Sequence, residues 1–370
     1  MSFSFAHPLL GPDSPIGEAD QALIAGLMIE EENPPQSSRR WTAAGARLAL
    51  DHLPGQIAEI FGGDGPMLDP ALRRTFRKAY LVGTGAALAA AQGLRPLFEE
   101  MLAGTSCEPI DSTDFSYYAR QAISADCLVI VFAAVEEPWR SLEATLAARA
   151  LGAFTLVLTA SDHARYDQYG QFIWRMAPPV DPIAAPSLLL AMAYRLGLAL
   201  GQLNGVAASR LAQLRAALDA IPRQLGSALI TTDADSAFAC EVQAAEHIVV
   251  AGNGAARAAA AANAHWIGAA IGRPVSLCGL EALGDIPSSP SVATLAIVPN
   301  GLSVRRAQLV LERRQGDGPM ALVVADNSPL RAIDASAIFL LPAMIERLST
   351  LVYLSVGQRI AVALLERRQP

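Results

Sequence analysis

Two short glycine turns carry many of the residues in this chain that could bind a small molecule. Gly83-Thr84-Gly85 and Gly252-Asn253-Gly254 each follow an apolar run and precede an alanine-rich segment. Backbone N–H groups at the start of a helix, with a neighbouring hydroxyl or amide, can hold a polar or anionic group. Arg257, just after the second turn, is either an anion ligand or an ordinary residue of a helix surface.

The two turns resemble those that bind dinucleotides, but the rest of that fingerprint is missing. Its third glycine is replaced by Leu88 in the first copy and by Arg257 in the second. No acidic residue closes a second strand at the distance needed to bind a ribose. We therefore expect no nicotinamide cofactor and no other cofactor.

The elements that position these turns repeat along the chain. Gly104 and Gly272 follow the two turns at nearly the same spacing, and the later apolar runs keep that spacing. Continuous apolar runs separated by helical segments are typical of a buried parallel sheet. The sequence predicts an α/β fold with two five-stranded, parallel, flavodoxin-like sheets flanked by helices. Ligands bind such sheets at the carboxyl ends of the strands.

The expected strands of the first unit are Ala79–Val82, Thr105–Ile110, Cys127–Phe132, Phe154–Leu158 and Gln171–Trp174. Those of the second unit are Ile248–Ala251, Val275–Cys278, Thr294–Val298, Ala321–Val324 and Ala337–Leu340. Helices are expected over Trp41–Phe61, Val206–Leu218, Gln224–Ala239, Ala255–Ala270 and Ile345–Glu366. We divide the chain into a leader (1–40), a first domain (41–205) and a second domain (206–370).

Composition excludes several classes of protein. The chain has 370 residues, 52% of them apolar, and a net charge of −7, which disfavours a general nucleic-acid binder. The start of the chain lacks a secretory signal, and polar residues break the apolar stretch from Ile183 to Leu200. We therefore expect a cytoplasmic protein with no membrane span. The four cysteines have no metal-binding spacing and are expected to be buried thiols, and no metal site is expected.

The order of these parts resembles a known family. A glycine turn after the first strand, Thr113-Asp114-Phe115 after the second and a helix start after the third are similar to sugar isomerase (SIS) domains. The duplication and the leader motif Met28-Ile29-Glu30-Glu31-Glu32-Asn33-Pro34-Pro35 look like the double-SIS enzymes. These include the isomerase half of glucosamine-6-phosphate synthase and the fructosamine-6-phosphate deglycases. The resemblance implies a small-molecule sugar derivative as ligand and a homodimer whose partner chain completes the cleft.

The loop after the third strand departs from the family pattern, which implies Ser-x-Ser-Gly-x-Thr around a sugar phosphate. Here the loop reads Ala133-Ala134-Val135-Glu136-Glu137-Pro138 and has no hydroxyl. Two carboxylates would oppose a phosphate dianion by on the order of 1 to 4 kcal/mol for each charge pair. Acidic residues and proline also suit an ordinary first turn of a helix. Both readings stay open.

The second domain departs from the pattern as well. The resemblance implies a Lys and a Glu on its first helix, where this chain has Gly268 and Ala269, and a His where it has Asp285. A slip of one residue in this alignment would allow Glu281 or Asp285 to act as a base, although Asp285 also suits a turn. His265 and Trp266 on the same helix are expected to make packing or dimer contacts.

Two functions follow from the resemblance. One is a phosphosugar isomerase or deglycase with substituted catalytic residues, and the alternative is an inactive SIS protein that binds or senses a sugar metabolite. A structural partner of another SIS protein is a third possibility. The residues expected to line the ligand site are Gly83, Thr84, Gly85, Asp114, Ala133, Ala134, Glu136, Glu137, Asp181, Asn253 and Arg257.

Overall fold

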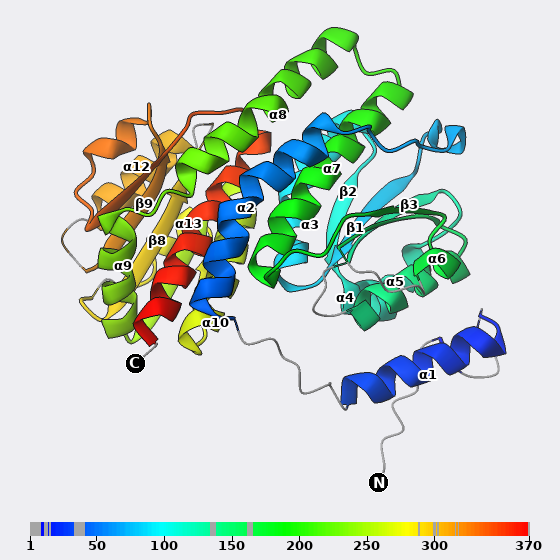
Figure 1. Cartoon of the computed structure of the whole chain (residues 1–370), viewed down its shortest axis with the longest axis horizontal. Helices are drawn as coiled ribbons and strands as arrows, with labels where there is room; N and C mark the ends of the chain where they lie inside the picture. Colours follow the sequence, from blue (N-terminus) through cyan, green and yellow to red (C-terminus); the bar gives the residue numbers. More distant parts are fainter. Residues whose placement is uncertain are drawn as a thin grey trace.

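A computed structural model describes most of the chain. It covers residues 9–10, 14, 16–32, 41–133, 138–160, 166–287, 289–298, 301, 303–314, 316 and 318–368. Two five-stranded sheets, which we call sheet A and sheet B, form its framework (Figure 1). All of the strand pairs are parallel. The predicted fold class is therefore confirmed.

The two sheets have the same strand order. Sheet A runs β2-β1-β3-β4-β5, and sheet B runs β10-β9-β8-β6-β7, which is the same order read from its other edge. The strands of sheet A are β1 (Lys78–Gly83), β2 (Cys107–Asp111), β3 (Cys127–Ala133), β4 (Phe154–Thr159) and β5 (Phe172–Arg175). Those of sheet B are β6 (His247–Gly252), β7 (Ser276–Cys278), β8 (Val292–Val298), β9 (Met320–Ala325) and β10 (Ala337–Leu341).

A layer of long helices fills the space between the sheets. Apolar side chains from both sheets and from these helices form one continuous core. In Figure 1, α13 lies beside α2 and α10. The helices of this layer are α2 (Ala43–Gly62), α3 (Gly85–Met101), α7 (Ala185–Leu203), α8 (Ala208–Ala228), α9 (Asp233–Ala244), α10 (Ala255–Ile271) and α13 (Glu346–Arg368). Because this core joins both halves, the domain boundaries at 40 and 205 remain a prediction.

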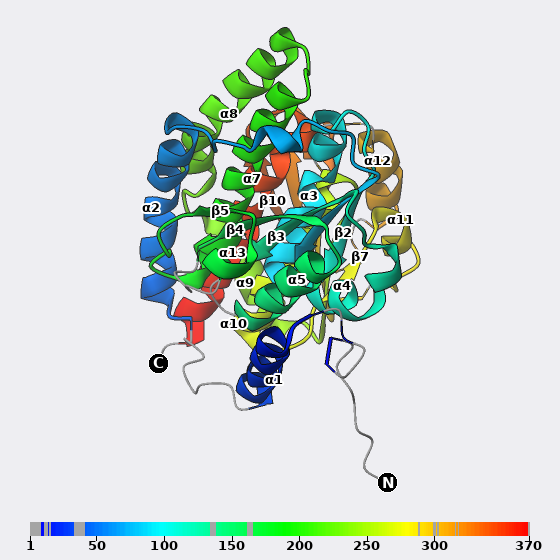
Figure 2. The same ribbon diagram turned by 90° about the vertical axis from the view of Figure 1, so that its right-hand side faces the viewer.

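Shorter helices cover the outer faces of the sheets. On sheet A these are α4 (Ser112–Tyr118), α5 (Pro138–Ala150) and α6 (Tyr166–Tyr169), with α1 (Glu18–Glu32) outside them (Figure 2). On sheet B they are α11 (Leu280–Leu283) and α12 (Val304–Glu312). Ile24 of α1 is buried in the outer cluster of sheet A, so this part of the predicted leader packs on the first half of the chain.

The extent of α8 differs from the sequence prediction. The sequence suggested that a helix ends at Leu218 and another begins at Gln224, but α8 continues through Pro222 to Ala228. Proline lacks an N–H and usually interrupts a helix. Here the buried side chains Leu214, Leu218, Ile221 and Leu225 keep a helical spacing across it, so packing against the core outweighs the local cost. The two helices are separated further along the chain, where Thr232 and Asp235 form a capping box at the start of α9.

Two helices are long and apolar enough to cross a membrane by length and composition. They are Pro182–Leu203 and Glu346–Arg368, whose most apolar windows are 89% and 94% buried inside the fold. A helix that is apolar on all sides can serve equally as the core of a large domain. Both are core helices of the layer between the sheets.

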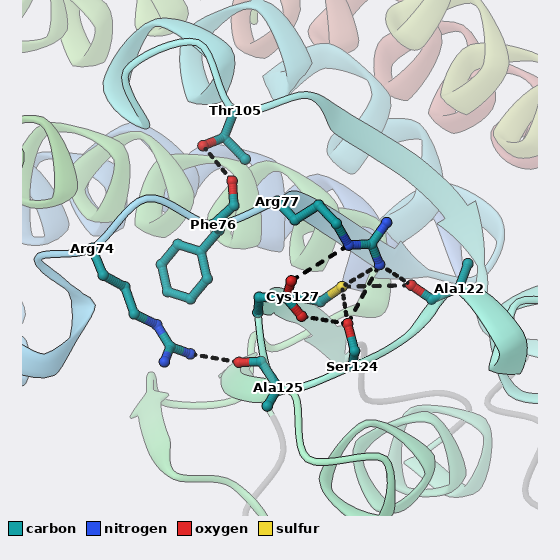
Figure 3. A network of polar contacts seen from close by, with 9 residues as sticks. Arg74, Phe76, Arg77, Thr105, Ala122, Ser124, Ala125 and Cys127 are labelled. Carbon is teal, nitrogen blue, oxygen red and sulfur yellow. Dashed lines mark hydrogen bonds and ion pairs between the residues drawn. The ribbon is translucent and has the colours of Figure 1, made fainter.

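The amino ends of the strands in sheet A are held by two arginines (Figure 3). Arg77 donates to the Ala122 carbonyl, at 2.5 Å, and lies 3.7 Å from Asp126. Arg74 donates to the Ala125 carbonyl and stacks over the ring of Phe76. These contacts stabilise the edge of the sheet opposite to the expected ligand site.

Candidate functional site

The site lies where the strand order of sheet A reverses. The strand β1 pairs with β2 on one side and with β3 on the other, so the loops after β1 and β3 diverge at its carboxyl end. A crevice at such a reversal is the usual ligand site of an open α/β sheet. The predicted residues Thr84 and Ala133 follow or end these two strands.

The turn after β1 requires both of its glycines. A Cβ on Gly83 would lie 2.9 Å from the backbone of Ala87, because the first turn of α3 comes close to the strand end. Gly85 has φ +55°, a conformation that side chains rarely adopt. The helix α3 therefore begins at the surface, with Gly85 exposed and its first N–H groups facing the carboxyl edge.

Two of the buried hydroxyls that have no hydrogen-bond partner among the described residues follow strands at this edge. Thr84 occupies the N-cap position of α3, and Ser112 begins α4; both hydroxyl oxygens are buried and unpaired. Gly83 is in register with Asp111, so Thr84 and Ser112 follow neighbouring positions of two paired strands. Buried polar groups almost always have a partner, which marks this place as one that a water or ligand completes. Sequence analysis missed Ser112, because it looked for hydroxyls after β3.

The charged groups near these hydroxyls come from α4 and α5. Asp111 caps α4 by accepting from the Thr113 N–H at 2.8 Å, and Asp114 is exposed in the first turn of that helix. Arg140, in the first turn of α5, donates to the Thr113 hydroxyl at 2.6 Å. The Arg140 guanidinium therefore lies against the first turn of α4, which also carries Asp114.

The end of β3 offers no polar side chain. Ala133 is fully buried and pairs with Thr159 of β4. The predicted residues Ala134, Glu136 and Glu137 lie outside the described residues. Because the side chain of Ala133 is fully buried, its place in the ligand site stays a prediction.

Asp181, after β5, is a buried carboxylate with a structural contact. It is 7% exposed and accepts from the Ile183 N–H at 3.0 Å. Its other oxygen lies 3.1 Å from the position that a Cβ on Gly45 would take, at the start of α2. Asp181 therefore joins the start of α2 to the loop after β5.

A side chain from the second half of the chain reaches this edge. His265 of α10 lies with its Cε1 atom 3.9 Å from the position that a Cβ on Gly85 would take. Its ring also contacts the ring of Trp41, two residues before α2 in the sequence, edge to face with 6.3 Å between centroids. Trp266 is 1% exposed and packs in the core as expected, whereas His265 is exposed. The helical period of α10 is enough to predict that one of these two neighbours is buried and the other exposed. No signal in the sequence places His265 beside Gly85.

The corresponding edge of sheet B holds the other predicted residues. Asn253 accepts from the Leu280 N–H at 3.2 Å, and the Arg257 guanidinium lies 3.7 Å from the position of a Cβ on Gly279. Gly254 has φ +58°, close to the +55° of Gly85 in the first half of the chain. The Glu346 carboxylate lies 3.5 Å from the place of a Cβ on Gly254 and even closer to that of Gly301. Residues Asn253 and Arg257 are thus grouped apart from Thr84, Asp114 and Ala133.

The two weak catalytic candidates lie on α11 and just after it. Glu281 binds Arg306 through two contacts of 2.5 and 3.0 Å, and this hydrogen bonding lowers the pKa of its carboxyl. Asp285 is exposed beside the same ion pair, in a groove of about 650 Å³ between α11 and α12. A carboxylate that is held by an arginine is a weaker base. The geometry gives Glu281 a structural partner.

A metal centre is not formed by the residues described. No group of three or more His, Cys, Asp or Glu side chains comes together among them. Cys107 and Cys127 are buried as expected, but Cys240 is exposed and Cys278 is half-buried, so the prediction of four buried thiols was wrong. Cys240 lies on the face of α9 that is exposed to solvent.

Two flavodoxin-like parallel sheets around a shared helical layer define the tandem SIS architecture. No family model matches the sequence, and no curated protein sequence does either. Solved structures share the fold. The C-terminal domain of glucosamine-fructose-6-phosphate aminotransferase from Francisella tularensis is similar with a TM-score of 0.75, at 14% identity, over 87% of this chain and 96% of that one.

A second similar structure is tagatose-6-phosphate ketose/aldose isomerase from Escherichia coli. Its TM-score is 0.62 at 15% identity, over 97% of this chain and 96% of that one. At such identities the likeness shows the fold. The resemblance to double-SIS proteins that the sequence suggested is confirmed at that level.

Proposed function

We propose that this chain binds a small carbohydrate derivative at the carboxyl edge of sheet A. The observation that carries the proposal is the pair of buried, unpartnered hydroxyls of Thr84 and Ser112 beside the start of α3. Sugar hydroxyls donate and accept hydrogen bonds and would satisfy both groups. The nearby guanidinium of Arg140 and the carboxylate of Asp114 suit a polar ligand that is neutral or is anchored by an arginine.

The fold supports a sugar as the ligand class. Both similar structures reported above carry names of enzymes that act on sugar phosphates. We infer that this chain is a sugar isomerase-like protein that works as a homodimer in the cytoplasm. Its reaction would be aldose–ketose isomerisation or deglycation, on a sugar phosphate or an amino sugar.

A second candidate is a protein that binds a sugar without turning it over. Glu281 is held by Arg306, and Ala269 and Asp285 stand where the resemblance implies an acid and a base. These substitutions favour a protein that has kept the crevice and lost the catalytic groups of its relatives. The distinction rests on whether a proton-transfer group remains near the ligand.

The proposal predicts little activity on the usual phosphosugars. Fructose 6-phosphate and glucosamine 6-phosphate should be isomerised with a kcat below ~1 s⁻¹, the low end of ordinary enzymes. The end of β3 supplies no hydroxyl, so the binding energy that positions the reacting carbons is reduced. A coupled assay measures this rate. A kcat above that value on either sugar would overturn the prediction.

A thermal-shift screen tests binding directly. The ligands are sugar phosphates, unphosphorylated sugars and nucleotide sugars, each against the full chain. A ligand at 100 times its Kd stabilises the native state by about 2.7 kcal/mol. The shift should shrink in Thr84→Val and Ser112→Ala but persist in the control Ser209→Ala, whose exposed hydroxyl lies on α8. No shift with any ligand, or equal shifts in all variants, would contradict the site.

A further inference from the structure

His265 is an exposed histidine of the second half of the chain that lies against the first half. It lies on α10, which belongs to sheet B, yet its Cε1 atom is 3.9 Å from the place of a Cβ on Gly85, where α3 of sheet A begins. Any larger residue at position 85 would lie against the imidazole and strain the backbone, since Gly85 has φ +55°. The glycine therefore keeps the space between the ring and the helix start open.

The ring is held on one side and available on the other. Trp41 contacts it edge to face at 6.3 Å, which fixes the ring without using its nitrogens. Among the described residues, no hydrogen bond or ion pair engages either ring nitrogen of His265. Ala269, one turn further along the same face of α10, is small and exposed, so α10 itself does not fill the space beside the ring.

The surroundings combine three chemical properties. An imidazole can take up and release a proton near neutral pH. The start of α3 presents N–H groups without helical partners and the positive end of the helix dipole. The unpaired hydroxyl of Thr84 lies at the same helix start. Together they offer a proton acceptor next to a place that stabilises a developing oxyanion.

We propose that His265 is the proton-transfer residue of the sheet A site, acting on C2 and C1 of an open-chain sugar. This inference rests on the proposed sugar site and assigns its catalytic group. It favours the isomerase-like reading over a protein that only binds. The base reaches the site from the other half of the chain, so turnover requires both halves.

The step balances without an outside oxidant or reductant. The imidazole takes the proton from C2 of the aldose, the C–H electron pair forms the C1–C2 double bond, and the carbonyl pair moves onto O1. The imidazolium then returns a proton to C1 while the hydroxyl proton of O2 passes to O1 and the C2 carbonyl forms. The first N–H groups of α3 would stabilise the negative charge on O1 in the enediolate.

Deuterium exchange measures this step even where turnover is slow. D-glucose, D-glucosamine and their 6-phosphates are incubated with the full chain in D₂O, and NMR follows loss of the C2 proton signal. We expect exchange with at least one of the four. His265→Gln should slow it by about 10²-fold or more, because a general base contributes typically 10²- to 10⁴-fold. The control His52→Gln changes an exposed histidine on α2 and should leave the rate unchanged.

Thermal shift on the same variants separates the two proposals. His265→Gln should remain folded and keep most of the ligand-induced shift, since Thr84 and Ser112 are intact. If sugars bind and the wild-type chain exchanges no deuterium, or if His265→Gln exchanges at the wild-type rate, the assignment of His265 is wrong and the binding site stands. If none of the four sugars shifts the melting temperature or exchanges, the proposed function itself fails.

Discussion

Glycines at the strand ends are required where a helix returns close to the strand. A Cβ on Gly252 would lie 2.6 Å from the carbonyl oxygen of Ala256, a backbone atom that cannot move aside alone. We expect Gly252→Ala to lower the free energy of unfolding by roughly 1–3 kcal/mol, in the range of strained backbone substitutions. Urea denaturation followed by circular dichroism measures the change.

Gly55 supplies a control of the opposite sign. It is an exposed residue inside α2, and a Cβ there would meet no atom within 4 Å. Gly55→Ala should stabilise the protein by roughly 0.5–1 kcal/mol, because alanine is the better helix former. Equal effects of the two substitutions would show that close approach at the strand end is not the cause.

The cysteines should differ sharply in reactivity. Burial raises the pKa of the Cys107 thiol to about 12, so this thiol stays protonated at pH 8. Cys240 is exposed, and thiolates are the reactive form. Iodoacetamide at pH 8, followed by peptide mass spectrometry, should modify Cys240 first and Cys107 only after denaturation. Rapid labelling of Cys107 in the native protein would contradict this account.

At the scale of elements, a buried ion pair joins α9 to α13. Arg359 is 7% exposed and lies 3.0 Å from the fully buried carboxylate of Asp235, while burial lowers the pKa of the guanidinium. The same guanidinium donates to the carbonyls of Ala228 and Ile230 at the end of α8. One side chain therefore links three helices of the layer between the sheets.

Removing one partner of this pair should be costly. Arg359→Met leaves the Asp235 carboxylate buried without its counter-ion, which typically costs about 3–5 kcal/mol. Arg367→Met, on the exposed end of the same helix, should change stability by less than about 0.5 kcal/mol. Chemical denaturation compares them. A change at Arg359 no larger than that at Arg367 would mean that the pair does not hold the helices together.

Sequence patterns predicted elements well where periodicity and glycine turns agree. The strand over Cys127–Ala133 and the helix over Ala255–Ile271 were predicted to within a residue or so. The strand expected to start at Thr105 begins at Cys107, because Thr105 closes the turn after α3, where its hydroxyl donates to the Leu102 carbonyl. A contact of this kind depends on a neighbour that a local pattern does not contain.

In the candidate site, too, local features could be predicted from the sequence and contacts between distant segments could not. Thr84 and Gly85 could be found from their place after an apolar run, since strand ends and helix starts are local features. Ser112 becomes its neighbour only through the register of β1 with β2. His265 reaches Gly85 through the packing of α10 on α3. Pairings between distant segments are what a single sequence leaves open.

At the scale of the whole molecule, the alanine-rich helix does not by itself argue for a dimer. Its small side chains could offer a flat face to a partner chain, but α10 packs closely against α3 and α13 of its own chain. The dimer remains a prediction from the resemblance. Light scattering at micromolar concentration should give twice the mass of the chain, 38.9 kDa each. A monomer would overturn it and leave the sheet A site to a single chain.

The Glu346 carboxylate beside Gly254 has a consequence for how many ligands this duplicated protein can hold. It lies at the second glycine turn. At the equivalent turn of the first half, the Thr84 hydroxyl has no partner among the described residues. A tethered carboxylate is present at very high effective concentration and needs no partner from solution. The two turns therefore differ: the chain places one of its own carboxylates at the second turn, whereas the first turn carries a buried hydroxyl that has no partner among the described residues. Titration calorimetry should return a stoichiometry of one sugar for each polypeptide, although the architecture is doubled.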